Sequence, residues 1–234
     1  MTTRVAMWSG PRNISTAMMR SFGARPDTLV VDEPLYAHYL DATGIDHPGR
    51  DAVLNSQTRR WEDVAAALTG PLPGTLAVYY QKHMAHHLLP DIGREWLGAL
   101  THAFLIRDPA HVVASYARVR GEPTLADLGF PQQVEIFRAF GGPVVEAADV
   151  LRDPAGTLGR LCAALGFAFY PAMLSWAPGP RETDGVWAPF WYDSVWASSS
   201  FAPYDPSPAV VPPHLAPLVE AARPYYAELA RHRL

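Results

Sequence analysis

Short apolar runs typical of buried strands alternate along this chain with stretches suited to helices. The predicted strands span residues 3–8, 28–32, 75–80, 103–106 and 143–145. The predicted helices between and after them span residues 14–25, 61–68, 158–165 and 215–229. Parallel strands need crossover connections of this kind. We therefore expect an α/β fold, a parallel sheet flanked by helices on both faces.

The amount of chain suits one large domain over residues 1–234. Hydrophobic residues make up 49% and charged residues only 18%, below the ~25% usual for globular proteins, which excludes a disordered chain. Residues 176–213 are rich in Trp, Pro and Ser. Because disordered segments rarely carry so many aromatic residues, we expect an ordered loop or lid there.

The net charge of −4 does not favour binding to nucleic acid or to an anionic membrane, so an anionic ligand needs a local cluster of positive groups. Cys162 is the only cysteine, which excludes an internal disulfide and a cysteine zinc site. No apolar run approaches the ~20 residues of a membrane span, and the first one is too short for a signal peptide. We expect a cytoplasmic protein.

The first predicted strand passes through a polar turn, residues 9–13, into a helix. A helix N-terminus offers free N–H groups and a positive dipole end, which suit a phosphate. Arg12 adds a charge, and Ser15 and Thr16 add hydroxyl donors. The turn is not a Walker A loop, because G-x-x-x-x-G-K-[ST] is absent. An ordinary helix capped by Asn13 or Ser15 is the alternative.

A second candidate anion site lies in FLIRDPAHVVASYARV, residues 104–119. The strand ends at Arg107, Asp108 and Pro109 suit a helix start, and Ser115 follows about two helical turns later. The forked donors of an arginine match phosphate oxygens. A structural salt bridge of Arg107 is the alternative.

Together these two segments resemble the sulfotransferase family. Pro11, Arg12, Asn13, Ile14, Ser15 and Thr16 stand in register with its 5′-phosphosulfate loop, P-K-S-G-T-T. Arg107 and Ser115 occupy the positions that grip the 3′-phosphate of the donor. The resemblance implies a P-loop-type sheet and 3′-phosphoadenosine 5′-phosphosulfate (PAPS) as donor. Arg12, Asn13, Ile14, Ser15, Thr16, Arg107 and Ser115 would bind this donor. Arg12 replaces a lysine of the loop and Ile14 a glycine.

Several further stretches resemble a bacterial and plant subgroup of this family, some of whose members carry names borrowed from branched-chain aminotransferases. They include DEPLYAHYL (32–40), YQKHMAHHLLP (80–90) and DGVWAPFWYDSV (184–195). Pyridoxal phosphate needs a Schiff-base lysine, and Lys82 stands in a different motif. Related sequences carry a basic K-S-T-G-F-like stretch where this chain has Ala197–Phe201. Whether this change reduces donor binding stays open.

Sulfuryl transfer needs positive charge near the leaving phosphate and a base for the acceptor proton. Arg12 and Lys82, the only lysine of the chain, are the candidates for charge stabilisation. Glu33 follows a strand end and is the first candidate base. His83 is the second, because cytosolic sulfotransferases use a K-x-H pattern, although Met84 stands at the equivalent position here. A surface role for Lys82 and a capping role for Glu33 are the alternatives.

The predicted function is sulfuryl transfer from PAPS to a hydroxyl or amine of a small-molecule acceptor, without a metal. One alternative is a kinase-like phosphotransferase using ATP, and another is a non-catalytic nucleotide-binding relative. The acceptor is not identified by the sequence, since acceptor pockets are built from variable loops. A homodimer is also left open.

Overall fold

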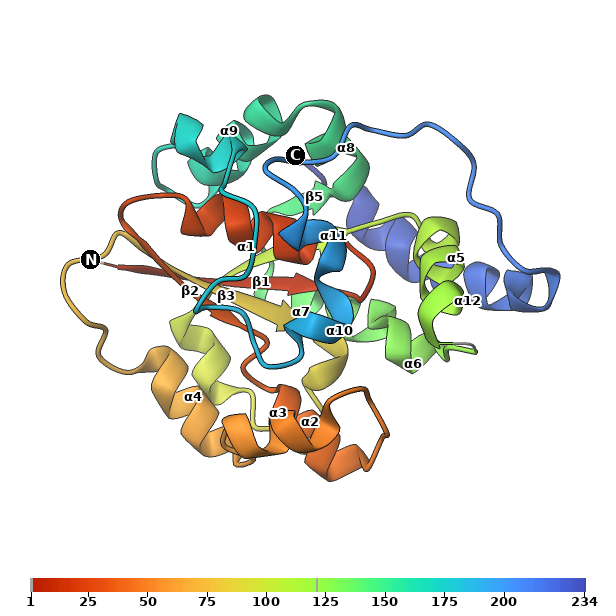
Figure 1. Ribbon diagram of the computed structural model, residues 1–234, viewed down its shortest axis with the longest axis horizontal. Coiled ribbons are helices and arrows are strands. Elements are labelled where there is room, and N and C mark those ends of the chain that lie inside the picture. Colours follow the sequence, from red (N-terminus) through yellow and green to blue (C-terminus); the bar gives the residue numbers. More distant parts are fainter. Residues whose placement is uncertain (1, 121) are drawn as a thin grey trace.

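The computed structural model describes residues 2–120 and 122–234, apart from the Arg120 side chain, and centres on a parallel sheet (Figure 1). The strands are β1 (Thr3–Ser9), β2 (Thr28–Asp32), β3 (Val78–Met84), β4 (Thr101–Ile106) and β5 (Val144–Glu146). Their order is β2-β3-β1-β4-β5, and every neighbouring pair is parallel. The predicted α/β fold is confirmed.

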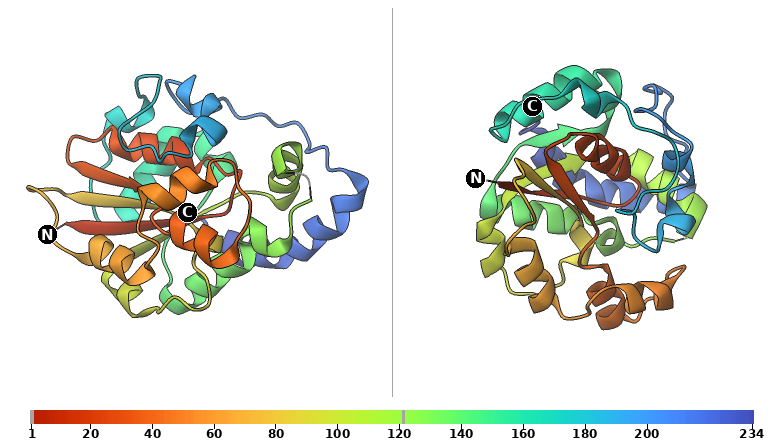
Figure 2. Two further views of the ribbon diagram at one scale, coloured as in Figure 1. Left: turned by 60° about the horizontal axis from the view of Figure 1, so that its bottom comes forward. Right: turned by 60° about the vertical axis from the view of Figure 1, so that its left-hand side comes forward.

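Side chains of β1 alternate between two apolar cores because successive residues of a strand point to opposite faces. Val5 and Met7 enter one core, and Ala6 and Trp8 enter the other. The first face is covered by α1 (Ser15–Gly23), α8 (Ala147–Arg152) and α9 (Pro154–Ala164). The second is covered by α4 (Trp61–Thr69), α7 (Phe130–Phe140) and α12 (Ala216–Ala230) (Figure 2). Helices on both faces are therefore confirmed.

Further helices and 3₁₀ turns complete the fold. The further α-helices are α2 (Tyr36–Thr43), α3 (Arg50–Ser56), α5 (Pro109–Arg120), α6 (Leu125–Leu128), α10 (Ala188–Trp191) and α11 (Asp193–Trp196). The 3₁₀ turns span Ala85–His87, Glu95–Ala99, Pro171–Leu174 and Pro213–Leu215. In the described part of the chain, no helix has the length and apolar character needed to cross a bilayer.

Strand β3 differs from its predicted span of residues 75–80, since it begins at Val78 and continues to Met84. The polar residues Gln81, Lys82 and His83 concealed its second half in the sequence. All seven residues of β3 are buried, because β1 and β2 pair with the strand on its two sides. Lys82 and His83 are therefore consecutive strand residues and point to opposite faces of the sheet.

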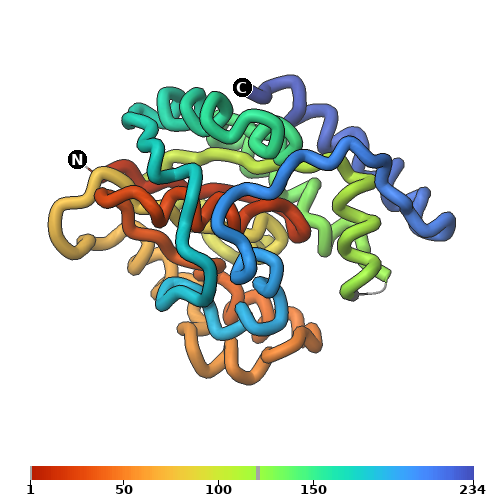
Figure 3. Tube along the Cα trace, turned by 45° about the horizontal axis from the view of Figure 1, so that its top comes forward, coloured from red at the N-terminus to blue at the C-terminus, as the bar shows by residue number. Residues whose placement is uncertain are grey.

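The aromatic-rich segment at 176–213 crosses the carboxyl edge of the sheet before running out to α12 (Figure 3). Ser175 forms an isolated antiparallel bridge with Ser200, and the Trp176 N–H donates to the Ser199 carbonyl at 2.8 Å. Helices α10 and α11 lie within this loop. Residues 201–212 contain no regular secondary structure. That the segment 176–213 acts as a lid stays a prediction.

Candidate functional site

A cavity of about 870 Å³ opens at the carboxyl ends of the strands. Strand β1 lies between β3 and β4: the chain places β2 and β3 on one side of it, then crosses to place β4 and β5 on the other, and ligands bind at such switch points in open α/β sheets. Every sequence-predicted site residue except His83 lines this one cavity: Arg12, Asn13, Ile14, Ser15, Thr16, Glu33, Lys82, Arg107 and Ser115. Segments distant in sequence are thereby brought together.

The N-terminal turn leaves the first N–H groups of α1 available to a ligand. Ile14 occupies the N-cap position, and no side chain forms a capping hydrogen bond. The alternative of a helix capped by Asn13 or Ser15 is therefore not what the structure has. Ile14 has φ −86°, which any residue adopts, whereas Arg12 has φ 57°. The left-handed conformation therefore falls on Arg12, and the structure does not require glycine at position 14. Asn13 Nδ2 anchors the turn by donating to the Leu105 carbonyl at 3.3 Å.

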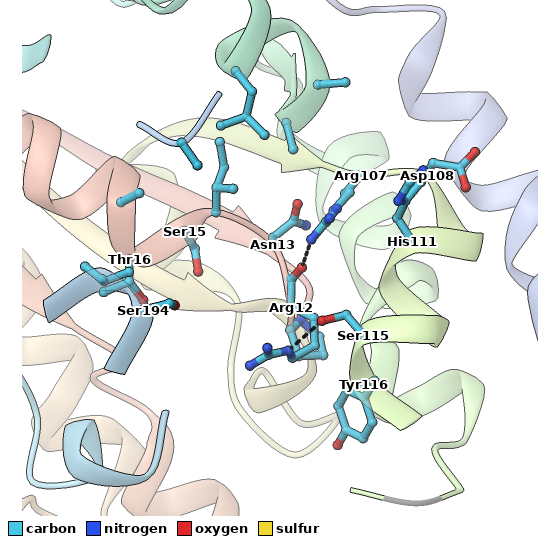
Figure 4. Close-up of a pocket in the computed structure, with 18 of the residues that line it drawn as sticks. Arg12, Asn13, Ser15, Thr16, Arg107, Asp108, His111, Ser115, Tyr116 and Ser194 are labelled. Carbon is cyan, nitrogen blue, oxygen red and sulfur yellow. Dashed lines mark hydrogen bonds between the residues drawn. The ribbon is translucent and has the colours of Figure 1, made fainter. Parts of the chain in front are cut away.

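Two arginines join the two predicted anion sites (Figure 4). Arg107 donates to the Arg12 carbonyl at 2.7 Å, and Arg12 Nε donates to Ser115 Oγ at 3.1 Å. Within the described ranges, neither guanidinium forms an ion pair with a carboxylate. Burial and the Arg118 charge lower the pKa of Arg12, while burial and the Arg12 charge lower that of Arg107. Clustered arginines without an ion-pair partner are chemically suited to bind an anion.

On the β2–β3 side of the cavity, Lys82 Nζ contacts three oxygen atoms. They are Asp32 Oδ1 at 2.8 Å, Glu33 Oε1 at 2.5 Å and the Tyr192 hydroxyl at 2.8 Å. Lys82 is 1% exposed, so it is not a surface lysine. Burial opposes its charge, but Asp32 and Glu33 outweigh that effect and raise the pKa of Lys82. Its ammonium is thus held by the chain's own oxygens.

Glu33 stands where β2 ends, with φ 39°, an unusual conformation for a residue with a side chain. Its side chain goes to Lys82 and not to the N-terminus of α2, whose N-cap is Leu35. Burial raises the pKa of Glu33 against the opposing effect of Lys82. A carboxylate with a raised pKa is better suited to accept a proton near neutral pH.

The histidines after Lys82 occupy different positions. His83 points away from the cavity, where it stacks on Trp8 at 4.4 Å and bonds Gln81 at 3.1 Å; burial lowers its pKa to about 3. His87 lines the cavity, and its Nδ1 lies 4.0 Å from Glu33 Oε2. Its ring stacks between Tyr36 and Tyr39, at 4.7 and 4.6 Å. Burial also lowers the pKa of His87, so its imidazole is neutral.

Sequence reasoning missed Asp32, His87 and Tyr192 as members of this site. Asp32 could have been found as a second carboxylate at the end of β2, and His87 as a polar residue just past the end of β3. No local signal distinguishes Tyr192 from the other aromatic residues of its segment. In the altered stretch, Ser198 and Ser200 line the cavity, and the Trp176 indole donates to Ser198 Oγ at 3.1 Å.

Glu146, at the end of β5, is a further buried carboxyl beside the cavity. Burial raises its pKa to about 7, against opposing hydrogen bonds from Tyr226 and the Ala148 backbone. A carboxyl with a raised folded-state pKa stabilises the fold below its unfolded pKa, and that contribution is lost as pH rises toward 7. The free energy of unfolding should therefore fall between about pH 4.5 and pH 7 because of Glu146.

The Glu146→Gln variant should remove this pH dependence. From pH 4.5 to pH 8 its free energy of unfolding should rise by about 2–3 kcal/mol relative to that of the wild type. Urea unfolding at the two pH values measures the difference. Glu135→Gln, at an exposed position on α7, is the matched control and should follow the wild type. Equal pH dependence in Glu146→Gln and the wild type would contradict the assignment.

Among residues 2–120 and 122–234, no group of three His, Cys, Asp or Glu side chains could hold a metal ion. The cavity instead has two chemically different ends. Cationic side chains and free helix N–H groups gather at the β1–β4 end, where they fit phosphate oxygens. A buried carboxylate, a neutral imidazole and aromatic rings gather near β2 and β3, where they fit a proton acceptor beside an organic molecule.

A family model described as a sulfotransferase domain matches residues 3–232. Two curated Arabidopsis thaliana proteins, branched-chain-amino-acid aminotransferase-like proteins 1 and 2, are 38% identical over 231 residues and 34% identical over 230 residues. Each alignment covers 96% of this chain and 41% of the relative, so the chain spans about two fifths of those proteins.

Two solved structures resemble this one in fold. The sulfotransferase domain of the Synechococcus PCC 7002 olefin synthase has a TM-score of 0.64 and 18% identity, covering 98% of this chain and 96% of that chain. The sulfotransferase domain from the curacin biosynthetic pathway has a TM-score of 0.58 and 16% identity, covering 98% of both chains. At these identities the likeness concerns the fold alone.

Proposed function

Because this chain belongs to the sulfotransferase domain family, as its motifs predicted, we propose that it transfers a sulfuryl group from PAPS to a hydroxyl or amine of a small-molecule acceptor. One observation carries the proposal: two arginines that form no ion pair within the described part of the chain and a buried carboxylate line opposite ends of a single cavity. The donor carries a 3′-phosphate and a 5′-phosphosulfate, so it needs cations at two points. Arg107 with Ser115 and Arg12 with the α1 N-terminus supply them.

In the proposed reaction the acceptor oxygen or nitrogen attacks the sulfur in line with the bond to the leaving phosphate oxygen. The new bond to sulfur forms as the S–O bond to the phosphate breaks, and the acceptor proton passes to the Glu33 carboxylate. Adenosine 3′,5′-bisphosphate then leaves. Arg12 and the N–H groups of α1 stabilise the charge on the leaving phosphate. Lys82 holds Glu33 in place through its 2.5 Å contact.

The aminotransferase-like names of the two curated relatives raise a different chemistry for this chain, which Lys82 does not favour. A Schiff base needs a neutral amine as the nucleophile. Lys82 is the only lysine, and its ammonium is buried between Asp32 and Glu33, which raise its pKa. Such a lysine stays protonated, so we assign no transamination to this domain.

Calorimetric titration tests the donor site directly. Adenosine 3′,5′-bisphosphate should bind about 10–100-fold more tightly than 5′-AMP, because its second phosphate gains charged hydrogen bonds. Addition of Mg²⁺ should leave this affinity unchanged, since the cations of the site are arginines. If ATP with Mg²⁺ bound more tightly than the bisphosphate, the kinase-like alternative would replace the proposal. Binding of none of these nucleotides would refute both.

A further inference from the structure

The segment from Asp184 to Trp196 is fixed to the sheet edge by buried polar contacts as well as by its aromatic rings. Asp184 accepts from Arg20 of α1 at 2.7 Å, and both side chains are almost fully buried. The Trp196 indole donates to the same carboxylate at 3.0 Å. A second anchor lies at Tyr192, between α10 and α11, where the segment meets β2 and β3.

Hydrogen-bond counting fixes the direction of each contact at Tyr192. Lys82 has three N–H groups, and Asp32, Glu33 and Tyr192 supply three acceptor oxygens. The Tyr192 hydroxyl has one proton, which it donates to Asp32 Oδ2 at 2.6 Å. It therefore accepts from Lys82 and from the Trp187 indole, which lies 3.1 Å away. The hydroxyl is thus bonded on all sides and is not turned toward a substrate.

We propose that Tyr192 is a positioning residue for Glu33: its hydroxyl satisfies Asp32 and Lys82 together, so that one N–H of Lys82 stays on Glu33 Oε1 while Oε2 serves the acceptor. The inference rests on the proposed role of Glu33 as the base. It also implies that the base is correctly arranged only when residues 184–196 are docked. Tyr192 touches neither donor nor acceptor in this scheme; it acts through Lys82 and, as a neighbour of Glu33, directly on the pKa of that carboxyl.

The charges around Glu33 determine what the loss of this hydroxyl would do. Lys82 of β3, Asp32 of β2, Tyr192 and His87 face the carboxylate. Without the hydroxyl, Asp32 loses a hydrogen-bond donor, and its attraction draws the Lys82 ammonium closer. The hydrogen bond from Lys82 to Glu33 is then weakened. Since both Lys82 and Tyr192 lower the pKa of Glu33 against its burial, that pKa should rise in the variant.

The Tyr192→Phe variant tests this coupling by ¹³C NMR titration of the Glu33 carboxyl, assigned by its absence in Glu33→Gln. The Glu33 resonance should titrate at higher pH than in the wild type. Simple loosening of the site would expose Glu33 and move its titration downward, toward the ordinary carboxyl range. The direction of the shift therefore separates positioning from general destabilisation. Tyr170→Phe, at an exposed position outside the cavity lining, is the matched control.

A second variant should shift the titration of Glu33 in the opposite direction. Asp32→Asn keeps the shape but removes the negative charge that raises the pKa of Glu33, so Glu33 should titrate at lower pH. Chemical denaturation of both variants checks that each is folded. In turnover assays, Tyr192→Phe should lower kcat about tenfold with little change in KM, as expected for loss of a charged hydrogen-bond network used in catalysis.

An unchanged or lowered titration of Glu33 in folded Tyr192→Phe overturns the positioning role. The NMR measurement does not depend on turnover. If the titration shifts upward but no acceptor is sulfated and no bisphosphate is bound, the coupling stands and the proposed function fails. If bisphosphate binds and sulfuryl transfer occurs while Glu33 titrates as in the wild type, the function stands and Tyr192 is only a packing residue.

Discussion

Replacing Glu33 by Gln is expected to lower kcat by about 10²–10⁴-fold, the usual contribution of a general base. The amide keeps the size of the side chain but cannot accept the acceptor proton. Binding of adenosine 3′,5′-bisphosphate should be retained, because Arg12 and Arg107 lie at the other end of the cavity. Steady-state kinetics with a sulfated acceptor and calorimetry with the bisphosphate measure the two effects separately.

Glu135→Gln, at an exposed position on α7, is the matched control for this substitution and should leave kcat unchanged. Full turnover in Glu33→Gln would remove Glu33 as the base. His87 would then be the next candidate, since its neutral imidazole lies beside Glu33 in the same cavity. His83 would not, because it packs against Trp8 on the opposite face of the sheet.

Replacing Arg107 by Ala is expected to weaken binding of adenosine 3′,5′-bisphosphate about 100-fold, since one or two hydrogen bonds to a doubly charged phosphate are lost. Binding of 5′-AMP should change much less, because it lacks the 3′-phosphate. The preference between the two nucleotides should therefore nearly disappear. Calorimetric titration of the variant with each nucleotide gives this ratio.

Arg107 also holds the Arg12 carbonyl at 2.7 Å, so some of the loss in Arg107→Ala could come from a displaced turn. The 5′-AMP titration separates these effects, since a displaced turn weakens both nucleotides equally. Arg138→Ala, on the exposed side of α7, is the control and should bind both as the wild type does. Equal weakening of both nucleotides would contradict the assignment of Arg107 to the 3′-phosphate.

Local patterns were enough to predict the α/β sheet and which residues line the cationic end of the cavity. The strands β1 and β2 are short apolar runs, and their predicted bounds agree with the structure to within a residue. The N-terminal turn and the Arg107–Ser115 pair each lie within one strand–helix unit, so sequence spacing places their side chains. Both positions then follow from helix and strand geometry.

Strand β3 shows where that reasoning stops. Its second half is polar, so an apolar pattern ended the prediction at Tyr80, whereas pairing with β2 continues to Lys82 and pairing with β1 to Met84. Because residues 81–84 belong to the strand, the side chains of Lys82 and His83 point to opposite faces of the sheet. A histidine next to the lysine in sequence is therefore remote from it in space, and His87 comes beside Glu33 instead.

The sequence by itself determined the α/β class, the family and the cationic end of the cavity, because these depend on the order of residues within single strand–helix units. Only the tertiary structure decided the partners of Lys82. The Tyr192 hydroxyl meets Asp32 across 160 residues of chain, and the Lys82 ammonium meets Asp32 across 50. Such contacts arise from packing of a long irregular segment onto the sheet edge, which no local periodicity encodes.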